Sequence, residues 1–287
     1  MAGISAGDVK ALRDSTGAGM MDCKNALKEA DGDVEKAMEL LRSSGLAKAG
    51  KRAGRETSEG AVVFSLSGGD GALIELGCET DFVAKTPDFQ GMAQGVADAA
   101  ATAKAADVAA ALAAPMAGGS VDDIVKAAVG KMGENIQLKR VASVSVSGVT
   151  GGYVHGGGKL GVLVALETAQ SGDEVAAVAR DVAMHVAAHD PTPIAVDRDD
   201  MPADVVEKER AFLTTQAKES GKPDNVIEKM VDGRINKFFA ENCLLAQGFV
   251  KDSDKSVRDI LGEAGQAAGG EIKVATFIRF KLGEAAE

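Results

Sequence analysis

Few side chains in this sequence of 287 residues could perform nucleophilic chemistry. It has three histidines and three cysteines, which are Cys23, Cys78 and Cys243. A Cys or Ser nucleophile needs a neighbouring base, and neither Cys78 nor Ser65 lies in a nucleophile-elbow sequence. An odd cysteine count without a CxxC pair also argues against a disulfide framework or a thiolate zinc site, and favours a reducing compartment. We therefore expect no enzymatic activity.

Two further patterns resemble known sites but lack essential residues. Gly156-Gly157-Gly158-Lys159 is similar to a phosphate-binding loop, but Tyr and Leu occupy positions 153 and 160, where that motif needs Gly and Ser or Thr. We interpret it as a hairpin turn. His185 and His189 have the spacing of an HExxH metal site, but the required glutamate and a third-ligand motif are missing. We expect no metal site and no cofactor.

One segment places a charged residue beside an aromatic one where an expected strand ends. It reads Cys78-Glu79-Thr80-Asp81-Phe82-Val83-Ala84, and Pro87 indicates that a helix begins soon after it. Phe82 is either packed in the core or presented to a partner, and burial statistics favour the core. Asp81 could act through its charge or as a cap for the following turn, and the sequence leaves both open.

The composition restricts the kinds of partner. The chain has 32 Lys and Arg against 43 Asp and Glu, a net charge of −11, and it has one Tyr, nine Phe and no Trp. Because nucleic-acid binders normally present a basic surface, we expect no direct nucleic-acid partner. No stretch approaches the roughly 20 apolar residues of a membrane span, and the N-terminal residues lack a signal-peptide pattern. We expect a cytoplasmic protein that does not bind membranes.

The first 45 residues predict three short helices. Ser5 and Asp8 form a capping-box pattern, and breaks follow at 16–19 and 31–32. The third helix has its apolar residues at helical spacing, and they are Val34, Ala37, Met38 and Leu41. We assign residues 1–45 to a three-helix module and the basic, glycine-containing stretch 46–59 to a linker.

Beyond the linker the apolar period changes to two, which indicates strands. Residues 61–66 and 72–76 predict a hairpin, followed by a helix over 88–103 and a strand over 136–146. Residues 152–168 repeat the pattern of 59–80, because both copies contain a hairpin, end in Glu-Thr and lead to an Ala-rich helix, over 88–103 in the first copy and over 173–188 in the second. We predict a duplicated hairpin-plus-helix core, with one unit over 60–147 and the other over 148–198 and 243–287.

Residues 199–242 predict two helices joined by a tight turn. Pro202 begins the first helix, which extends to about Ser220, and Gly221-Lys222-Pro223 turns the chain. Such a pair forms an antiparallel helical hairpin, which we expect to project from the core. The predicted fold class is therefore α+β.

Several ordered motifs, which together cover nearly the whole chain, resemble the bacterial elongation factor Ts family. They are Leu12-Arg13, Thr16-Gly17-Ala18-Gly19-Met20-Met21-Asp22-Cys23-Lys24, Cys78-Glu79-Thr80-Asp81-Phe82-Val83-Ala84, Tyr153-x-His155, Met184-His185-Val186-Ala187-Ala188, Ser220-Gly221-Lys222-Pro223 and Phe277-Ile278-Arg279-Phe280. The chain differs from the family's longer members at its C-terminus, where those continue into a further helical module.

The resemblance implies a guanine nucleotide exchange factor that binds elongation factor Tu, both GDP-bound and nucleotide-free, and releases GDP during translation elongation. It implies a ubiquitin-associated-like N-terminal module, and a role for Thr80, Asp81, Phe82 and Val83 in entering the GTPase and disturbing its Mg²⁺ site. It further implies partner contacts from a second set of residues, which are Arg13, Met20, Met21, Lys24 and His155. The alternative that Met20 and Met21 are core residues remains open.

Two other classes of function make different predictions. A non-catalytic chaperone or scaffold module for a GTPase would use the three-helix module and the hairpin, and Asp81 and Phe82 would be dispensable. An enzyme would turn over a substrate and lose activity on Cys78→Ser, but no base partner accompanies this thiol in the sequence.

Overall fold

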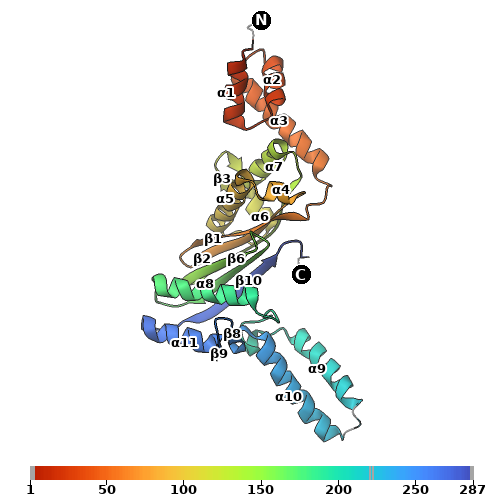
Figure 1. Ribbon diagram of the computed structural model, residues 1–287, viewed down its shortest axis with the longest axis vertical. Helices are drawn as coiled ribbons and strands as arrows, with labels where there is room; N and C mark the ends of the chain where they lie inside the picture. The colour runs from red at the N-terminus through yellow and green to blue at the C-terminus, as the bar shows by residue number, and fades with distance from the viewer. Residues whose placement is uncertain (1–3, 220, 222, 285–287) are drawn as a thin grey trace.

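The computed structural model describes residues 4–219, 221 and 223–284, apart from the side chains at positions 46 and 48. Ser220 and Lys222 of the predicted turn lie outside the described residues. Helices and strands occur throughout the chain, and the strands form antiparallel sheets, as the predicted α+β class requires. Figure 1 shows an elongated molecule with a three-helix module at one end, a helical hairpin at the other and the sheets between them.

The N-terminal module consists of three helices, which are α1 (Ala6–Thr16), α2 (Met20–Glu29) and α3 (Val34–Arg52). The predicted capping box is present, because Ser5 and Asp8 exchange hydrogen bonds at the start of α1. Leu12 and Leu27 are fully buried between the helices. The predicted apolar face of α3 is only partly correct, since Val34 is 48% and Met38 42% exposed.

The predicted linker over 46–59 is wrong for its first residues, because α3 continues to Arg52. The second half of α3 packs against α7 (Val121–Met132). Ala49 is buried there, and the Arg52 guanidinium donates a hydrogen bond to the Val129 carbonyl at 3.1 Å. A long-range contact therefore stabilises helix in a stretch whose composition is typical of a linker.

The first core unit is a three-stranded antiparallel sheet with the order β1-β2-β5. Its strands are β1 (Glu59–Ser67), β2 (Asp70–Cys78) and β5 (Ile136–Ser145). One face of the sheet is covered by helices, which include α5 (Pro87–Ala103), α6 (Val108–Ala113) and α7. A two-stranded ribbon, β3 (Pro115–Met116) with β4 (Gly119–Ser120), leads into α7.

The second core unit has the same plan, with strand order β10-β7-β6. Its strands are β6 (Gly148–His155), β7 (Leu160–Glu167) and β10 (Lys273–Lys281). Two helices cover its outer face, α8 (Asp173–Ala188) and α11 (Val257–Ala268). Shorter elements connect these to the hairpin, namely η1 (Arg198–Asp200), η2 (Leu244–Ala246), β8 (Gly248–Phe249) and β9 (Asp252–Ser256).

The two sheets pack face to face, so that the core has four layers in the order helix, sheet, sheet, helix (Figure 1). Val62, Leu73 and Leu163 are fully buried between the sheets. Gly161 permits this close approach, since a Cβ atom there would lie 2.4 Å from a Val62 methyl. A buried ion pair between Glu75 and Arg140 also joins the units. Arg140 donates a hydrogen bond to the Lys281 carbonyl, and the Glu75 carboxylate accepts one from the Gly283 N–H.

The hairpin consists of α9 (Ala203–Lys218) and α10 (Asp224–Asn242), which pack on each other and extend away from the sheets (Figure 1). Their small shared core contains Leu213, Ile227 and Val231. At the base, the Arg198 guanidinium lies 4.3 Å from the centre of the Phe239 ring.

Candidate partner-binding site

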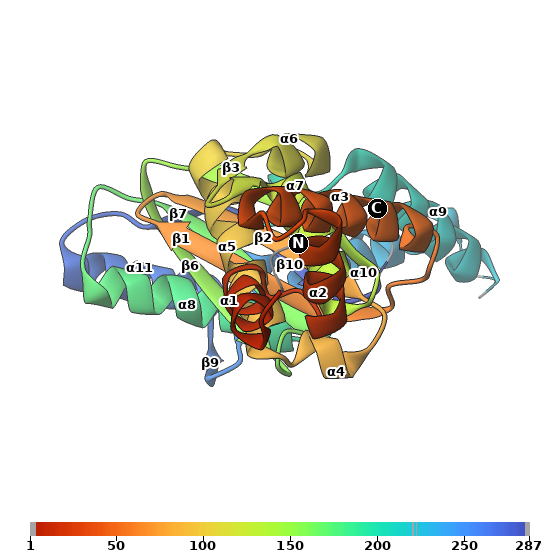
Figure 2. The same ribbon diagram turned by 90° about the horizontal axis from the view of Figure 1, so that it is seen from above.

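The segment after β2 forms a single helical turn, α4 (Asp81–Ala84), which the sequence did not predict. Val83 and Ala84 pack against the core of the first unit, whereas Phe82 points outward and is 81% exposed. The core placement that burial statistics alone favour for Phe82 is therefore wrong, and its role towards a partner stays a prediction. Viewed along the long axis, α4 lies at the edge of the molecule (Figure 2). The turn presents an aromatic ring to solvent.

Two threonines fix the ends of this turn. Thr80 is the N-cap, and its hydroxyl oxygen accepts a hydrogen bond from the Val83 backbone N–H at 3.3 Å. Thr86 donates to the Val83 carbonyl at 2.8 Å and caps α5. Gln90 donates to the Ala84 carbonyl at 2.6 Å. The local backbone is therefore constrained on both sides of the exposed ring.

Asp81 does not cap the turn, because Thr80 occupies that position. Its carboxylate accepts a hydrogen bond from the Lys85 ammonium at 2.6 Å. This contact, with a smaller contribution from the charge of Lys159, holds the Asp81 pKa below its usual range. Asp81 is therefore ionised at neutral pH, and its 44% exposed side chain is accessible to a partner.

Glu134, which lies between α7 and β5, also contacts the segment that carries the turn, and the sequence did not predict this contact. It follows the C-cap of α7, Gly133, and accepts hydrogen bonds from the backbone N–H groups of Glu79 and Thr80 and from the Thr80 hydroxyl. Its position in the sequence, more than 50 residues from Thr80 and without a recognisable motif, could not reveal this contact.

The turn between β6 and β7 lies near α4. His155 ends β6 and is exposed, and its Nδ1 lies 3.1 Å from the Tyr153 hydroxyl. Strand pairing of His155 with Leu160 confirms that 156–159 is a hairpin turn. Lys85, Tyr153 and Gly157 line one groove between the two core units. The structure therefore brings the α4 turn and the neighbourhood of His155 to one side of the core.

The remaining predicted contacts lie on the three-helix module, which Figure 1 shows at the far end of the molecule. Arg13 on α1 and Lys24 on α2 are exposed. Met20 and Met21 begin α2 and are 56% and 63% exposed, so the alternative that they are core residues is wrong. Large exposed apolar side chains at the start of a helix are typical of a contact surface.

The sequence is similar to those of known proteins. Residues 79–284 match the family model described as Elongation factor TS. The chain is 49% identical to elongation factor Ts of Alkalilimnicola ehrlichii, over 99% of this chain and 94% of the relative. It is 45% identical to that of Chlorobium phaeobacteroides, over 99% of this chain and all of the relative. For Aquifex aeolicus the identity is 40%, over 98% of each chain.

The chain belongs to the elongation factor Ts family. The family match includes α4 and Glu134 but begins after the three-helix module. The relatives extend the similarity over that module too, since they cover 98–99% of this chain.

The first histidine of the His185 and His189 pair is used in packing. His185 is fully buried, its Nε2 lies 3.0 Å from Gln247 Oε1, and its Nδ1 accepts from the Val250 backbone N–H at 3.3 Å. Burial lowers the pKa of His185 to about 4, so the ring is neutral at neutral pH. Both nitrogens are occupied, and neither is free to bind a metal.

Cys78 is also fully buried, and its thiol donates to the Thr80 carbonyl at 3.1 Å. Burial, followed by the nearby Glu134 carboxylate, raises the pKa of Cys78 to about 12. The thiol is therefore protonated at neutral pH and is a poor nucleophile.

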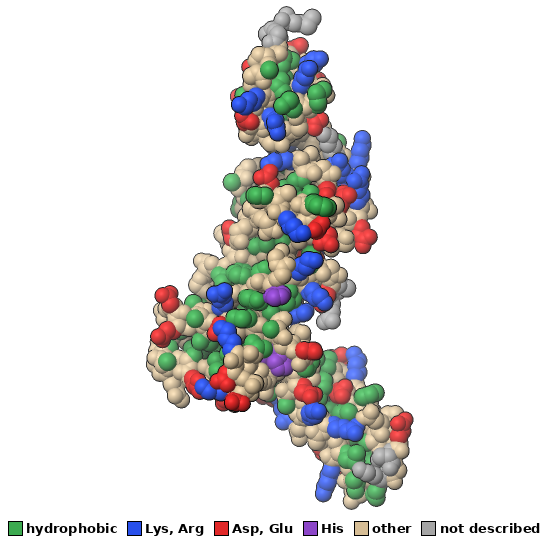
Figure 3. Space-filling view, viewed as in Figure 1, with side chains coloured by type: hydrophobic (Ala, Val, Ile, Leu, Met, Phe, Trp, Pro, Cys, Tyr) green, Lys and Arg blue, Asp and Glu red, His purple; other side chains and the backbone are tan. Residues whose placement is uncertain are grey.

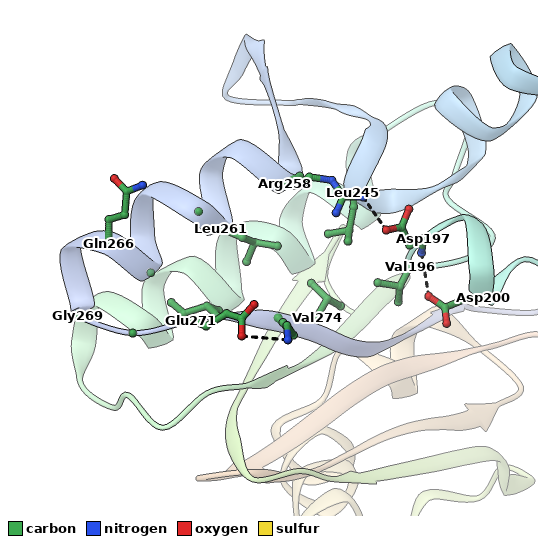
Figure 4. A pocket seen from close by; sticks show the side chains of 15 residues that line it. Val196, Asp197, Asp200, Leu245, Arg258, Leu261, Gln266, Gly269, Glu271 and Val274 are labelled. Atoms are coloured by element: carbon green, nitrogen blue, oxygen red, sulfur yellow. Dashed lines mark hydrogen bonds and ion pairs between the residues drawn. The ribbon is translucent and has the colours of Figure 1, made fainter.

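A separate hollow lies on the second core unit between α11, β10 and the residues around η1 (Figure 4). Charged side chains at this hollow pair with one another, as Arg258 does with Asp197 at 2.6 Å and Lys273 with Glu271 at 3.0 Å. Because these charges already pair with one another, the exposed Phe82 ring on α4 is the better candidate for a functional surface.

Proposed function

We propose that this protein is a guanine nucleotide exchange factor for elongation factor Tu that acts in translation elongation and catalyses no covalent step itself. The observation that carries the proposal is Phe82, which is 81% exposed on a turn held at both ends, in a member of the elongation factor Ts family. A rigid exposed aromatic residue is typical of an interface hot spot.

In the proposed mechanism, the turn from Thr80 to Val83 enters the GTPase beside its bound nucleotide. GDP is held there by Mg²⁺ and by backbone donors around the phosphates. The Phe82 ring separates two elements of the partner, and the ionised Asp81 carboxylate perturbs the Mg²⁺ site. Release follows because the exchange factor binds the nucleotide-free GTPase more tightly than the GDP-bound form.

The energetics require more than one contact. A thousandfold weakening of nucleotide binding needs about 4 kcal/mol of coupling, whereas burial of one Phe contributes about 1.5–3 kcal/mol. We propose that the rest comes from His155 in the second core unit and from the three-helix module, through Arg13, Met20, Met21 and Lys24. We further propose that this module is ubiquitin-associated-like and docks on the same partner.

We infer a protein partner in the cytoplasm and no direct contact with nucleic acid or membrane. On the face shown in Figure 3, basic and acidic side chains are interspersed, an arrangement that suits a protein surface better than a polyanion. Among the described residues, the protein has no helix with the length and apolarity needed to span a bilayer.

The test is the release of fluorescent GDP from purified elongation factor Tu, with this protein added in substoichiometric amount. Fast release over multiple turnovers supports exchange. Tight binding without faster release would refute the exchange function and support the scaffold alternative. Failure to bind would refute both.

A further inference from the structure

The exposed turn that carries Phe82 rests on one carboxylate from a distant part of the chain. Glu134 Oε2 accepts the backbone N–H of Glu79 at 3.1 Å and that of Thr80 at 3.0 Å, and Oε1 accepts the Thr80 hydroxyl at 2.6 Å. Hydrogen bonds to an ionised acceptor are shorter and stronger than neutral ones. All of them hold Thr80, the N-cap of the turn, or Glu79, the residue before it.

The hydroxyl of Thr80 connects this carboxylate to the turn itself. The same oxygen that donates its proton to Glu134 accepts the Val83 N–H, so the orientation of the cap depends on Glu134. The Thr80 carbonyl also accepts the Cys78 thiol proton and the Ala84 N–H. Every polar group of Thr80 is thus engaged, and Phe82 lies only two residues further along.

A second set of contacts fixes Glu134 in turn. The next residue, Asn135, donates its backbone N–H to the Glu79 carboxylate at 2.6 Å and its side-chain amide to the Arg55 carbonyl at 2.7 Å. Arg55 and Glu79 form an ion pair at 3.3 Å. Glu134 therefore sits on a short connection between α7 and β5 that is itself tied to the start of the turn.

The location of Glu134 is otherwise unfavourable for a carboxylate. It directly follows the C-terminus of α7, where the helix dipole disfavours negative charge. The donors from Glu79 and Thr80 offset this cost, so the carboxylate and the turn stabilise one another. Thr86, Gln90 and the packing of Ala84 hold the C-terminal side of the turn, whereas Glu134 holds its N-cap, so losing the carboxylate loosens the N-terminal side from which Phe82 projects.

We propose that Glu134 is a positioning residue for exchange, which acts through Thr80 to hold Phe82 in the orientation that enters the GTPase. The proposal rests on the exchange function proposed above. Positioning matters because a ring held in its bound orientation loses less conformational entropy on binding and reaches the partner in a productive geometry.

The test is Glu134→Ala in the GDP-release assay, measured over a range of concentrations of the full-length variant. We expect the maximal release rate to fall about tenfold, which is the equivalent of about one hydrogen bond to a charged group. The half-saturating concentration should change less than about twofold, because the other docking surfaces are intact. Glu134→Gln keeps an acceptor for the two backbone N–H groups and should lose only about threefold.

A double-mutant cycle with Phe82→Ala separates positioning from a general effect on the fold. If Glu134 acts through Phe82, Glu134→Ala should reduce release by less than about twofold in the Phe82→Ala background. An equal fold loss in both backgrounds would overturn the proposal, and so would an unchanged rate in Glu134→Ala. If urea titrations show that Glu134→Ala is already unfolded without urea, the same cycle with Glu134→Gln decides the matter. A wild-type protein that does not accelerate release would instead refute the exchange function itself.

Discussion

Replacing Phe82 with alanine should separate function from stability in a single variant. The side chain is 81% exposed, so its removal should change the free energy of unfolding by no more than about 0.5 kcal/mol. Burying a Phe contributes about 1.5–3 kcal/mol, and applying the exposed fraction of 81% leaves about 1.2–2.4 kcal/mol to be gained in the complex. At about 1.4 kcal/mol per factor of ten, we expect exchange to weaken about 7- to 50-fold.

The assay is the catalytic efficiency of GDP release from elongation factor Tu, with urea unfolding of the same preparation. Phe212→Ala is the matched control, because Phe212 on α9 is 61% exposed but lies outside the proposed site. It should leave both stability and exchange near wild-type values. Phe89→Ala is the opposite control, since Phe89 is fully buried and its loss should cost about 3–5 kcal/mol of stability.

Two results would refute this reasoning. Normal exchange by Phe82→Ala would show that the ring does not enter the partner. An equal loss in Phe212→Ala would show that exposed aromatic area matters in general, whatever its position.

Four further predictions concern other residues. Asp81→Asn should keep the α4 turn, because Thr80 caps it, but should slow GDP release severalfold if the charge acts on the Mg²⁺ site; unchanged release would limit Asp81 to its contact with Lys85. Glu75→Ala should lower the free energy of unfolding in urea by about 3–5 kcal/mol, because it leaves Arg140 as a buried unpaired charge. The pKa of His185 is about 4 in the folded state, below its unfolded value of about 6.5. Its contribution to stability is therefore complete above about pH 6.5 and is lost as pH falls towards 4. His185→Asn should weaken this pH dependence of stability. Native Cys78, with a pKa of about 12, should resist thiol reagents at pH 8, and Cys78→Ser should retain exchange, whereas loss of exchange without loss of fold would contradict a purely structural thiol.

Local signals in the sequence located most of the helices and strands. The helix predicted from Asp173 to Ala188 is observed with those bounds, and the one over 88–103 begins one residue earlier. The hairpin of β1 and β2 extends only a few residues beyond its predicted strands. These elements are encoded by periodicity, caps and turn residues, which act over a few positions.

Predictions failed where a distant contact overrides local preference. The stretch from 46 to 52 has the composition of a linker, but it is helical where α7 provides a partner surface. Val34 and Met38 follow a helical apolar pattern, but the small module cannot bury both, and they remain exposed. Periodicity records which residues share a face and does not show what covers that face.

The sequence by itself determined the family, the order of the elements and the segment that contains Phe82, because ordered motifs and short-range patterns are properties of the chain. Only the tertiary structure decided that Phe82 projects outward, that Thr80 rather than Asp81 caps the turn, and that Glu134 supports it. The physical reason is that the exposure of a side chain and the partners of a carboxylate depend on residues more than 50 positions away, which come together only when the sheets and helices pack.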